Sequence, residues 1–390
     1  MTAAQRYLIA TIFSLTVMVG VGTSTMPPAL AAVQRIFGIG PDASGVLLSV
    51  FTLPGLVLTP LLGYVADRLG RRAVVVLSLV VFAVGGLAAL AAQTFEHLVV
   101  VRLVQGIGAA SLGALNVALI SDFFEGQQRV RLLGFNHSVL SVGTAILPVV
   151  SGQLAAFEWR LPFVLPAAGI LVAMAIVVFV PPASARAHEA ASVGGSVRWR
   201  SLGVLLVVSA VTYALLFGPF LNYLQERIAR LDPAAPNLYQ RIGTMIGTMS
   251  VATTLGALFV GRLARRVMLV RMLQTACVLY GLALVLFVVM PSYELLFVPT
   301  VVFGLAQAFN QPVVQALVAA LAPAMRSATV LSLNRMAALV GQTLGPIAFG
   351  VVWRIGGLST VFIVGAVVAV VCAVAVALVK SPSLESSPQS

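Results

Sequence analysis

The sequence predicts an all-α membrane protein in which twelve transmembrane helices form two pseudo-symmetric six-helix bundles. Three observations support this fold class: an extreme composition, a succession of long apolar runs, and an internal repeat. Of the 390 residues, 60% are hydrophobic and only 9% are charged, and the mean hydropathy is +1.07. A soluble domain mixes polar and apolar residues far more evenly, so we expect the chain to lie in a membrane.

The apolar runs follow one another along the whole chain, and each can supply the roughly 20 residues that cross a bilayer core. The predicted spans are 7–31, 43–65, 72–92, 95–122, 131–154, 161–181, 201–224, 241–262, 267–290, 293–321, 328–352 and 358–379. Shared among twelve spans, the 390 residues give about 32 each, which is one helix and a short turn. The sequence leaves no room for a soluble domain. The first run is too long for the core of a signal peptide, so we expect it to stay as a helix.

The cysteines, histidines and glycines form no pattern typical of an enzyme. Cys277 and Cys372 lie inside apolar runs, so we expect them to pack as small hydrophobic residues without a disulfide. The three histidines are scattered, and no zinc-protease or hydrolase motif occurs. The glycine-rich stretch 106–113 follows no strand and lacks the lysine of a phosphate-binding loop. We therefore expect no catalytic residue, no metal and no cofactor.

The net charge of +12 follows membrane topology and does not indicate a nucleic-acid partner. With both chain ends on one side, twelve spans divide the loops into two sets, one much richer in arginine. The richer set contains Arg6, Arg68, Arg71, Arg72, Arg129, Arg131, Arg186, Arg198, Arg200, Arg262, Arg265, Arg266, Arg271, Arg326 and Lys380. The poorer set contains Arg35, Arg160, Arg227, Arg230, Arg241 and Arg354. Basic loops stay in the cytoplasm, so we expect a multi-pass protein of the cell (inner) membrane with both termini cytoplasmic and membrane lipids around its basic loops.

A shift of 198 residues aligns the two halves of the chain without a gap over a long stretch. Shared glycine, proline and asparagine are harder to obtain by chance than matches among apolar residues. The aligned pairs are Gly63/Gly261, Gly106/Gly304, Asn136/Asn334, Gly143/Gly341, Pro148/Pro346 and Gly152/Gly350. The repeat predicts an N-terminal bundle over 1–181, a cytoplasmic linker over 182–200, a C-terminal bundle over 201–380 and a cytoplasmic tail over 381–390. Parallel repeats commonly enclose a binding site near the middle of the membrane.

The loop between the second and third spans concentrates charge in a chain that has little. Its sequence, "GYVADRLGRR" (63–72), resembles the signature G-x-x-x-D-R-x-G-R-R of the major facilitator superfamily. The matching residues are Gly63, Asp67, Arg68, Gly70, Arg71 and Arg72. Two further stretches, "RLVQGIGAA" (102–110) and "EWRLPF" (158–163), are similar to the superfamily's fourth-helix motif and to its link into helix six.

A third motif lies in the fifth span. Gly134, Gly143, Pro148 and Gly152 follow the spacing of the fifth-helix motif found in antiporters of this superfamily, although Leu147 and Ser151 stand where that pattern prefers glycine. The chain is therefore identified as a member of the superfamily, most similar to its twelve-helix drug:proton antiporter group.

The resemblance implies a cytoplasmic gate built by the 63–72 loop. Asp67 would face the start of helix eleven near 327–329, where the helix dipole favours an anion. Arg71 would pair with Asp122 at the cytoplasmic end of helix four. These contacts would hold the cytoplasmic side shut while the binding site faces outward. The alternative is that the loop's charges only mark topology.

Two details refine the expected gate. Gly63 and Gly70 would let the backbones approach closely. The second half of the chain has Arg265 where Asp67 would be, so the gate is expected in only one of the two repeats.

Charges inside a membrane are costly and therefore functional by default. Arg102 lies in the first third of helix four, with Gln105 one turn further on. We expect both to serve the cavity in proton or substrate handling, because the superfamily's fourth-helix arginine does so. A structural hydrogen bond between helices is the alternative.

His137 and Arg335 occupy equivalent positions in helices five and eleven, each directly after an asparagine. The repeat would place these helices across the cavity from each other. Asn136, His137, Asn334 and Arg335 are thus expected to form a polar ring toward its cytoplasmic third. Histidine titrates near neutral pH, which suits reversible protonation, but a lone histidine in a membrane span is more often a helix-packing hydrogen-bond donor, and this is the alternative role of His137.

Helix ten carries several amides, of which 307, 311 and 315 lie on one face because their spacing is four residues. We expect the helix-ten amides to contact substrate, and they are Gln307, Asn310, Gln311 and Gln315. No Asp or Glu lies in the middle of a span, so coupling through a buried carboxylate has no support.

The function predicted from these features is secondary active transport by alternating access, with proton-coupled efflux of a small drug-like organic molecule. The expected partners are this substrate, protons and membrane lipids, and we expect a monomer. The alternative is a facilitator or symporter of an anionic metabolite, because Arg102, Arg335 and a protonated His137 would make the cavity positive. A third hypothesis, a static scaffold or receptor, would not need an intact gate motif.

Overall fold

The structure is a computed structural model that describes residues 3–181, 199–233, 235–321 and 327–377. Most of the predicted linker (182–200) and all of the predicted tail (381–390) lie outside this range, as do Arg186, Arg198, Arg326 and Lys380. The first bundle contains α1 (Ala3–Ser24), α2 (Met26–Phe37), α3 (Pro41–Leu69), α4 (Arg71–Ala88), α5 (Phe95–Ala109), α6 (Leu112–Phe123), α7 (Gly126–Phe157) and α8 (Ala168–Phe179). The second bundle contains α9 (Trp199–Leu215), α10 (Leu221–Leu231), α11 (Leu238–Leu263), α12 (Leu269–Val289), α13 (Phe297–Leu321) and α14 (Ser327–Ala377).

Short tight turns extend several of these helices. Ala89–Ala91, Leu161–Ala167 and Glu294–Leu296 are 3₁₀ turns, and Leu216–Phe220 is a π turn that contains Pro219. The π turn joins α9 to α10 in one bent span, because proline removes a helical hydrogen bond and bends the axis. A similar break at Thr25, before Pro27, separates α1 from α2 within the first span.

Eleven helical segments among the described residues are long and apolar enough to cross a membrane. The last of these segments contains two consecutive spans. α14 contains 51 residues, which would measure about 77 Å as one helix, against a bilayer core of about 30 Å. Its backbone leaves the helical region at Gly357, where φ is 73°, a conformation that glycine adopts without strain. With one helix on each side of Gly357, the described residues form the predicted twelve spans.

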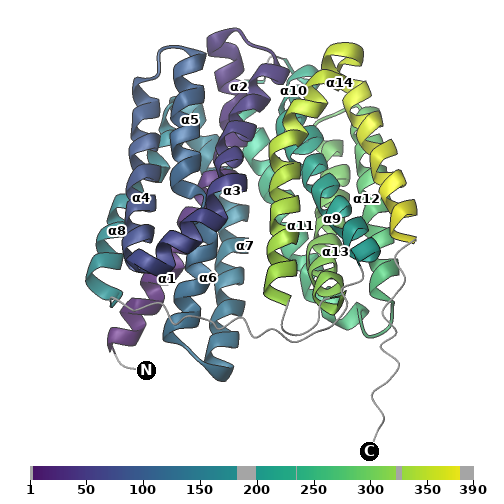
Figure 1. The fold of residues 1–390 in the computed structure, drawn as a ribbon. Coiled ribbons are helices and arrows are strands. Elements are labelled where there is room, and N and C mark those ends of the chain that lie inside the picture. Colours follow the sequence, from purple (N-terminus) through teal and green to yellow (C-terminus); the bar gives the residue numbers. More distant parts are fainter. Residues whose placement is uncertain (1–2, 182–198, 234, 322–326, 378–390) are drawn as a thin grey trace, which may run out of the picture.

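The helices form two bundles that stand side by side and meet at one end (Figure 1). One cluster of buried side chains lies within the first bundle, and another lies within the second, where it includes the buried thiols of Cys277 and Cys372. The largest cluster draws on both, with Leu30 and Leu47 from the first bundle and Phe220 and Phe287 from the second. The shared cluster therefore joins the bundles where they meet.

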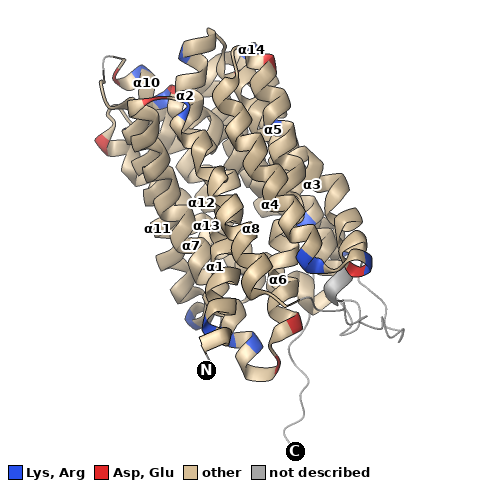
Figure 2. Ribbon diagram, turned by 90° about the vertical axis from the view of Figure 1, so that its left-hand side faces the viewer, with Lys and Arg blue, Asp and Glu red and all other residues tan. Residues whose placement is uncertain are grey.

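The charged residues lie mainly at the two ends of the helices (Figure 2). One end holds Ala3, the α3–α4 turn at Gly70 and the α6–α7 turn, and we call it the basic end. The described basic residues there are Arg6, Arg68, Arg71, Arg72, Arg129, Arg131, Arg200, Arg262, Arg265, Arg266 and Arg271. The other end, which we call the opposite end, holds the turn between α2 and α3 and the kink at Gly357. The bundles meet at the opposite end.

Candidate functional site

The first contact surface between the bundles lies between α3 and α14. The Asp42 carboxylate accepts a hydrogen bond from Arg354 Nε at 2.6 Å, and Asn222 Nδ2 donates to the carbonyl of Pro41 at 2.9 Å. Deeper in the membrane, the hydroxyls of Thr52 and Thr343 are 2.9 Å apart. These bonds hold the start of α3 against the second bundle at the opposite end.

The second contact surface lies between α7 and α11, and it depends on close backbone approach. A Cβ atom on Gly243 would lie 2.4 Å from the carbonyl oxygen of Pro148. A Cβ on Gly152 would lie 2.5 Å from the carbonyl oxygen of Tyr239. Only glycine permits such contacts. Two residues of the predicted fifth-helix motif, Pro148 and Gly152, thus lie where the bundles meet, whereas Gly143 contacts only Leu147 of its own helix.

Arg335 continues the first contact surface beyond the point where the bundles separate. Four, eight and eleven residues further along α14 are Leu339, Thr343 and Pro346, which contact Gly55, Thr52 and Gly45 of α3. Residues at this spacing share one face of a helix. Arg335 therefore lies on the face of α14 that is turned toward the first bundle.

His137 stands in the same relation to the second contact surface. Eight, eleven and fifteen residues further along α7 are Ala145, Pro148 and Gly152, all of which contact α11. His137 is exposed and lies on that face, toward the basic end. The repeat thus places one ionisable side chain at the open edge of each contact surface.

A hollow of about 240 Å³, which we call the second hollow, lies on the inner side of the second bundle. Residues from α9, α13 and α14 line it: Ser209, Tyr213, Asn310, Gln311, Val314, Gln315, Leu331, Asn334, Arg335 and Ala338. Gln311 Nε2 donates to the Tyr213 hydroxyl at 3.1 Å, and Asn310 Nδ2 donates to Thr212 Oγ1 at 3.0 Å. Seven of the ten lining residues carry a polar side chain.

Another hollow, of about 170 Å³, lies at the matching place in the first bundle, and we call it the first hollow. Residues from α1, α6 and α7 line it: Thr16, Val19, Gly113, Asn116, Val117, Leu133, Asn136, His137 and Leu140. Asn136 Nδ2 donates to Asn116 Oδ1 at 2.8 Å, Asn116 Nδ2 donates to Thr16 Oγ1 at 3.1 Å, and the Thr16 hydroxyl donates to Asn136 Oδ1. This closed triangle ties three helices together, and apolar residues form most of the remaining wall.

The four residues of the expected polar ring therefore occupy two walls. Asn136 and His137 line the first hollow, and Asn334 and Arg335 line the second. No hydrogen bond among the described residues joins the pairs across the bundles. His137 has no hydrogen-bond partner in the described chain, so the geometry gives no support to a helix-packing role in this state.

Arg102 and Gln105 lie away from both hollows. Arg102 is buried between α5 and α3, where Nη1 donates to Gln105 Oε1 at 2.9 Å and the guanidinium lies 4.2 Å from the ring centre of Phe51. Nε reaches the Leu47 carbonyl at 3.5 Å. This geometry fits the alternative role of Arg102, a structural hydrogen bond between helices. A role of Arg102 and Gln105 in the cavity stays a prediction.

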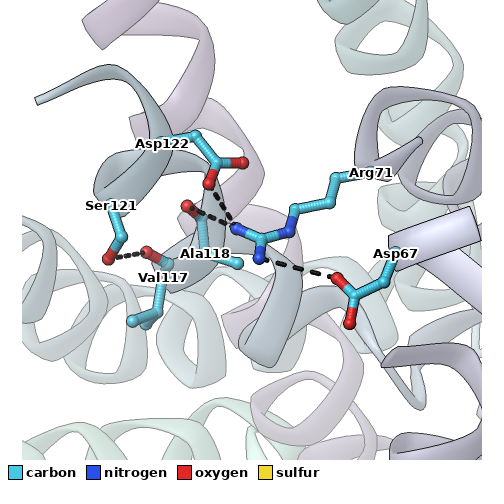
Figure 3. A network of polar contacts seen from close by, with 6 residues as sticks. All are labelled: Asp67, Arg71, Val117, Ala118, Ser121 and Asp122. Atoms are coloured by element: carbon cyan, nitrogen blue, oxygen red, sulfur yellow. Dashed lines mark hydrogen bonds and ion pairs between the residues drawn. The ribbon is translucent and has the colours of Figure 1, made fainter. Parts of the chain in front are cut away.

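The loop expected to form the gate lies at the basic end (Figure 3). Arg71 Nη1 lies 2.6 Å from Asp122 Oδ1 and donates to the Ala118 carbonyl at 3.1 Å. Asp67 is 60% exposed and lies 3.6 Å from Arg71 Nη2. The Arg71–Asp122 pair is thus present, while Asp67 has no described partner in the second bundle. Its expected contact at 327–329 adjoins residues outside the described range and stays a prediction.

The other gate residues have local roles in this state. The guanidinium of Arg68 lies 4.6 Å from the ring centre of Tyr64, and Arg72 Nη2 donates to the carbonyl of Val177. The expected close approach at the glycines is absent among the described residues, because a Cβ on Gly63 or Gly70 would meet nothing within 4 Å. Gly70 instead ends α3 with a φ of 89°.

The amides of the tenth predicted span lie in α13, and they divide in the same way. Asn310, Gln311 and Gln315 line the second hollow, whereas Gln307 accepts a hydrogen bond from Tyr280 inside the bundle. Sequence reasoning did not single out Thr16, Asn116, Ser209 and Tyr213, which also line the hollows. For Asn116 a signal was available, since it is an amide in the middle of an otherwise apolar run.

Comparisons with known proteins agree with this fold. The family model described as Major Facilitator Superfamily matches residues 12–226 and 217–390. Protein spinster homolog 3 of Danio rerio is 27% identical over 261 residues, which cover 61% of this chain and 52% of the relative. Multidrug resistance protein 1 of Bacillus subtilis (strain 168) is 30% identical over 152 residues, 39% of each chain. The chain thus spans about half, or less, of the length of the curated relatives it matches.

A solved structure extends the likeness over the whole fold. The crystal structure of the nucleoside transporter NupG superposes with a TM-score of 0.79 at 18% identity, and covers 96% of this chain and 98% of that one. At this identity the likeness establishes the fold alone. The family match, which extends over both bundles, establishes more: this chain is a multi-pass membrane protein that belongs to the Major Facilitator Superfamily.

Proposed function

We propose that the chain exports a small organic molecule by alternating access, with the two hollows as facing halves of one binding cavity. The observation that carries this proposal is that each hollow adjoins a contact surface that is complete toward the opposite end and ends at the hollow. A substrate between the hollows would be reached from the basic end. If the basic end is cytoplasmic, as the positive-inside rule predicts, this state is open to the cytoplasm and closed to the exterior.

The hollows are individually small for such a ligand. Pockets for drug-sized molecules measure about 300–1,000 Å³, and the hollows measure about 240 and 170 Å³. A substrate that contacts both walls would use the combined space, and its passage would require the contacts of Asp42, Asn222 and Thr52 to break. The export direction draws support from the fifth-helix spacing and from the name of the Bacillus multidrug resistance relative.

We further propose that protons drive the export and that His137 carries them. His137 is the one histidine among the residues that line the two hollows, and histidine commonly serves as a proton shuttle. The test is flux in proteoliposomes with an imposed pH gradient, in which export should be matched by proton uptake in the other direction. His137→Ala should abolish the response to the gradient, while His97→Ala, which changes an exposed histidine at the start of α5, should leave it intact. A gradient response that survives His137→Ala would exclude His137 as the proton carrier.

A second candidate is facilitated transport or symport of an anionic metabolite. It is favoured by the charge of the walls, which carry Arg335 and no carboxylate among the described residues. Flux down the substrate gradient that does not change with the pH gradient would support the facilitator. Substrate uptake that follows inward proton flow would support the symporter.

A further inference from the structure

The two hollows differ in which of their polar groups are already bonded. On the first wall, the amides of Asn116 and Asn136 are fully engaged in the triangle with Thr16. On the second wall, Asn310 is 2% exposed and Asn334 is 8% exposed, yet the Oδ1 atom of each has no hydrogen-bond partner. A buried acceptor without a partner costs about 1–3 kcal/mol, and native proteins leave few of them.

The open acceptors of the second wall require donors. Asn310 already uses its Nδ2 to donate to Thr212, so its oxygen is the atom left for another partner. Asn334 immediately precedes Arg335, and both side chains line the same hollow. Both oxygens are closed to solvent in this state, so a ligand bearing a hydroxyl or N–H group would satisfy them once the amides turn toward the hollow.

Arg335 adds a fixed positive charge to the same wall. It is exposed, and no ion pair among the described residues includes it. The planar guanidinium binds carboxylate or phosphate through two parallel hydrogen bonds. Neither wall contains an Asp or Glu that could serve as the counter-ion, so the guanidinium is available to an anionic group of a ligand.

The first wall offers the opposite chemistry. With the amide triangle closed, its remaining surface is formed chiefly by Val19, Val117, Leu133 and Leu140, beside His137. This surface favours an apolar group over a hydrated one. A substrate that spans both hollows would therefore need one polar and one apolar end.

We infer that the substrate is an amphipathic organic acid. Its anionic group binds Arg335, a hydroxyl or N–H group beside the acid donates to the amide oxygens of Asn310 and Asn334, and its apolar body lies against the first wall. This inference rests on the proposed transport function and names the substrate class of the same cavity. It does not depend on the direction of transport or on coupling to protons.

A set of five small probes separates the three parts of this proposal. Mandelate carries a carboxylate, a neighbouring hydroxyl and a ring. Phenylacetate lacks the hydroxyl, lactate lacks the ring, 1-phenyl-1,2-ethanediol lacks the charge, and 2-amino-1-phenylethanol replaces the anion with a cation. Equilibrium binding to the detergent-solubilised full chain is measured first, and counterflow of the same probes in proteoliposomes second.

Mandelate should bind most tightly. Loss of the carboxylate or its replacement by a cation should weaken binding about tenfold or more, since hydrogen bonds to charged groups contribute about 1.5–3 kcal/mol. Loss of the hydroxyl or of the ring should each weaken it by a smaller factor. In Arg335→Gln the preference for mandelate over the diol should disappear, and Arg335→Lys should retain part of it. Arg271→Gln, which removes an exposed arginine at the same end but outside the hollow, should keep the full preference.

The outcomes for the substrate class and for transport are distinct. Equal binding of the diol and mandelate, tighter binding of the cation, or no saturable binding of any probe would overturn the substrate class. So would a preference for mandelate that Arg335→Gln leaves unchanged. Binding with the expected preference but without counterflow would leave the substrate class standing and contradict the transport proposal. Counterflow of the cation alone would contradict the substrate class and leave the transport proposal standing.

Discussion

α3 presents two different surfaces along its length. In its first half, Leu47 and Thr52 are buried at the junction with the second bundle. In its second half, Val57 is 67% exposed, Leu61 is 52% exposed and Tyr64 is 54% exposed. A Cβ on Gly55 would still meet Leu339 of α14, whereas a Cβ on Gly63 would meet nothing within 4 Å.

The two ends of the molecule also use different chemistry. At the opposite end, the bundles are joined mainly by glycine contacts and short polar bonds, which act only at close range, and by one solvent-screened ion pair, Asp42–Arg354. At the basic end, the charges of Asp67 and Arg71 lie within one bundle. A contact surface that depends on close packing is lost abruptly when the two faces separate, because packed interfaces have discrete arrangements. Opposite charges still attract each other across about 8–10 Å. The comparison suggests that packing holds this state and charge would hold the other, and four substitutions test this.

The largest effect should come from filling the α7–α11 contact with Gly243→Val. The new Cβ would lie 2.4 Å from the Pro148 carbonyl oxygen, so the bundles could not close at the opposite end without a backbone shift. Flux should be lost, and overpacking should cost about 1–3 kcal/mol of stability or more. Gly261→Val, in the same helix but with nothing within 4 Å, is the control and should retain flux. Normal flux in Gly243→Val would show that close packing is not what holds this end.

Asp67→Asn should reduce transport severalfold without destabilising the protein. Its carboxylate is 60% exposed and only 3.6 Å from Arg71, and exposed pairs of this kind contribute about 0–1 kcal/mol. The expected role is in the other state, where the charge would reach the start of α14. Flux and thermal unfolding are measured on the same preparation. Unchanged transport would count against the gate.

Asp122→Ala should show the reverse pattern, a loss of stability. The side chains of Arg71 and Asp122 are 15% and 9% exposed and lie 2.6 Å apart, so removal of the carboxylate leaves a poorly solvated guanidinium. A hydrogen bond to a charged group contributes about 1.5–3 kcal/mol, and denaturation in mild detergent should detect a loss of that order. A double-mutant cycle with Arg71→Ala isolates the pair, and a coupling energy near zero would contradict this account.

The smallest effect is expected from Asp42→Asn at the opposite end. Arg354 is 70% exposed and Asp42 is 12% exposed, so solvent screens the pair and its contribution should not exceed about 1 kcal/mol. The balance between states should shift no more than about fivefold, which spin-label distances across α3 and α14 can measure. High salt should produce the same shift in the parent and none in the variant. A larger shift would mean that charge holds this end after all.

The fold could be predicted because its determinants are local. Each span is an apolar run, and Pro219 and Gly357 mark bends or breaks through their own backbone chemistry. The repeat was visible in part because some paired glycines mark close backbone contacts: a Cβ on Gly106 or on Gly304 would lie 2.3 or 2.5 Å from a backbone carbonyl oxygen.

The walls of the hollows were less predictable, because the direction of a side chain depends on how its helix is rotated by all its neighbours. Arg102 resembles a cavity residue in sequence, yet it lies under Phe51 and beside Gln105. Gln307 shares a helix face with Gln311, but Tyr280 draws it into the bundle. Whether an amide is satisfied, as at Asn136, or left open, as at Asn334, depends on partners that are far away in the sequence.

The burial of both thiols has a practical consequence. Cys277 is 1% exposed and Cys372 is 5% exposed, and the chain contains no other cysteine. Maleimide dyes should therefore label a cysteine introduced on the surface far faster than either native one. Fluorophores placed on the two bundles at the basic end would then report the opening and closing of single molecules, in a chain whose own cysteines need not be replaced.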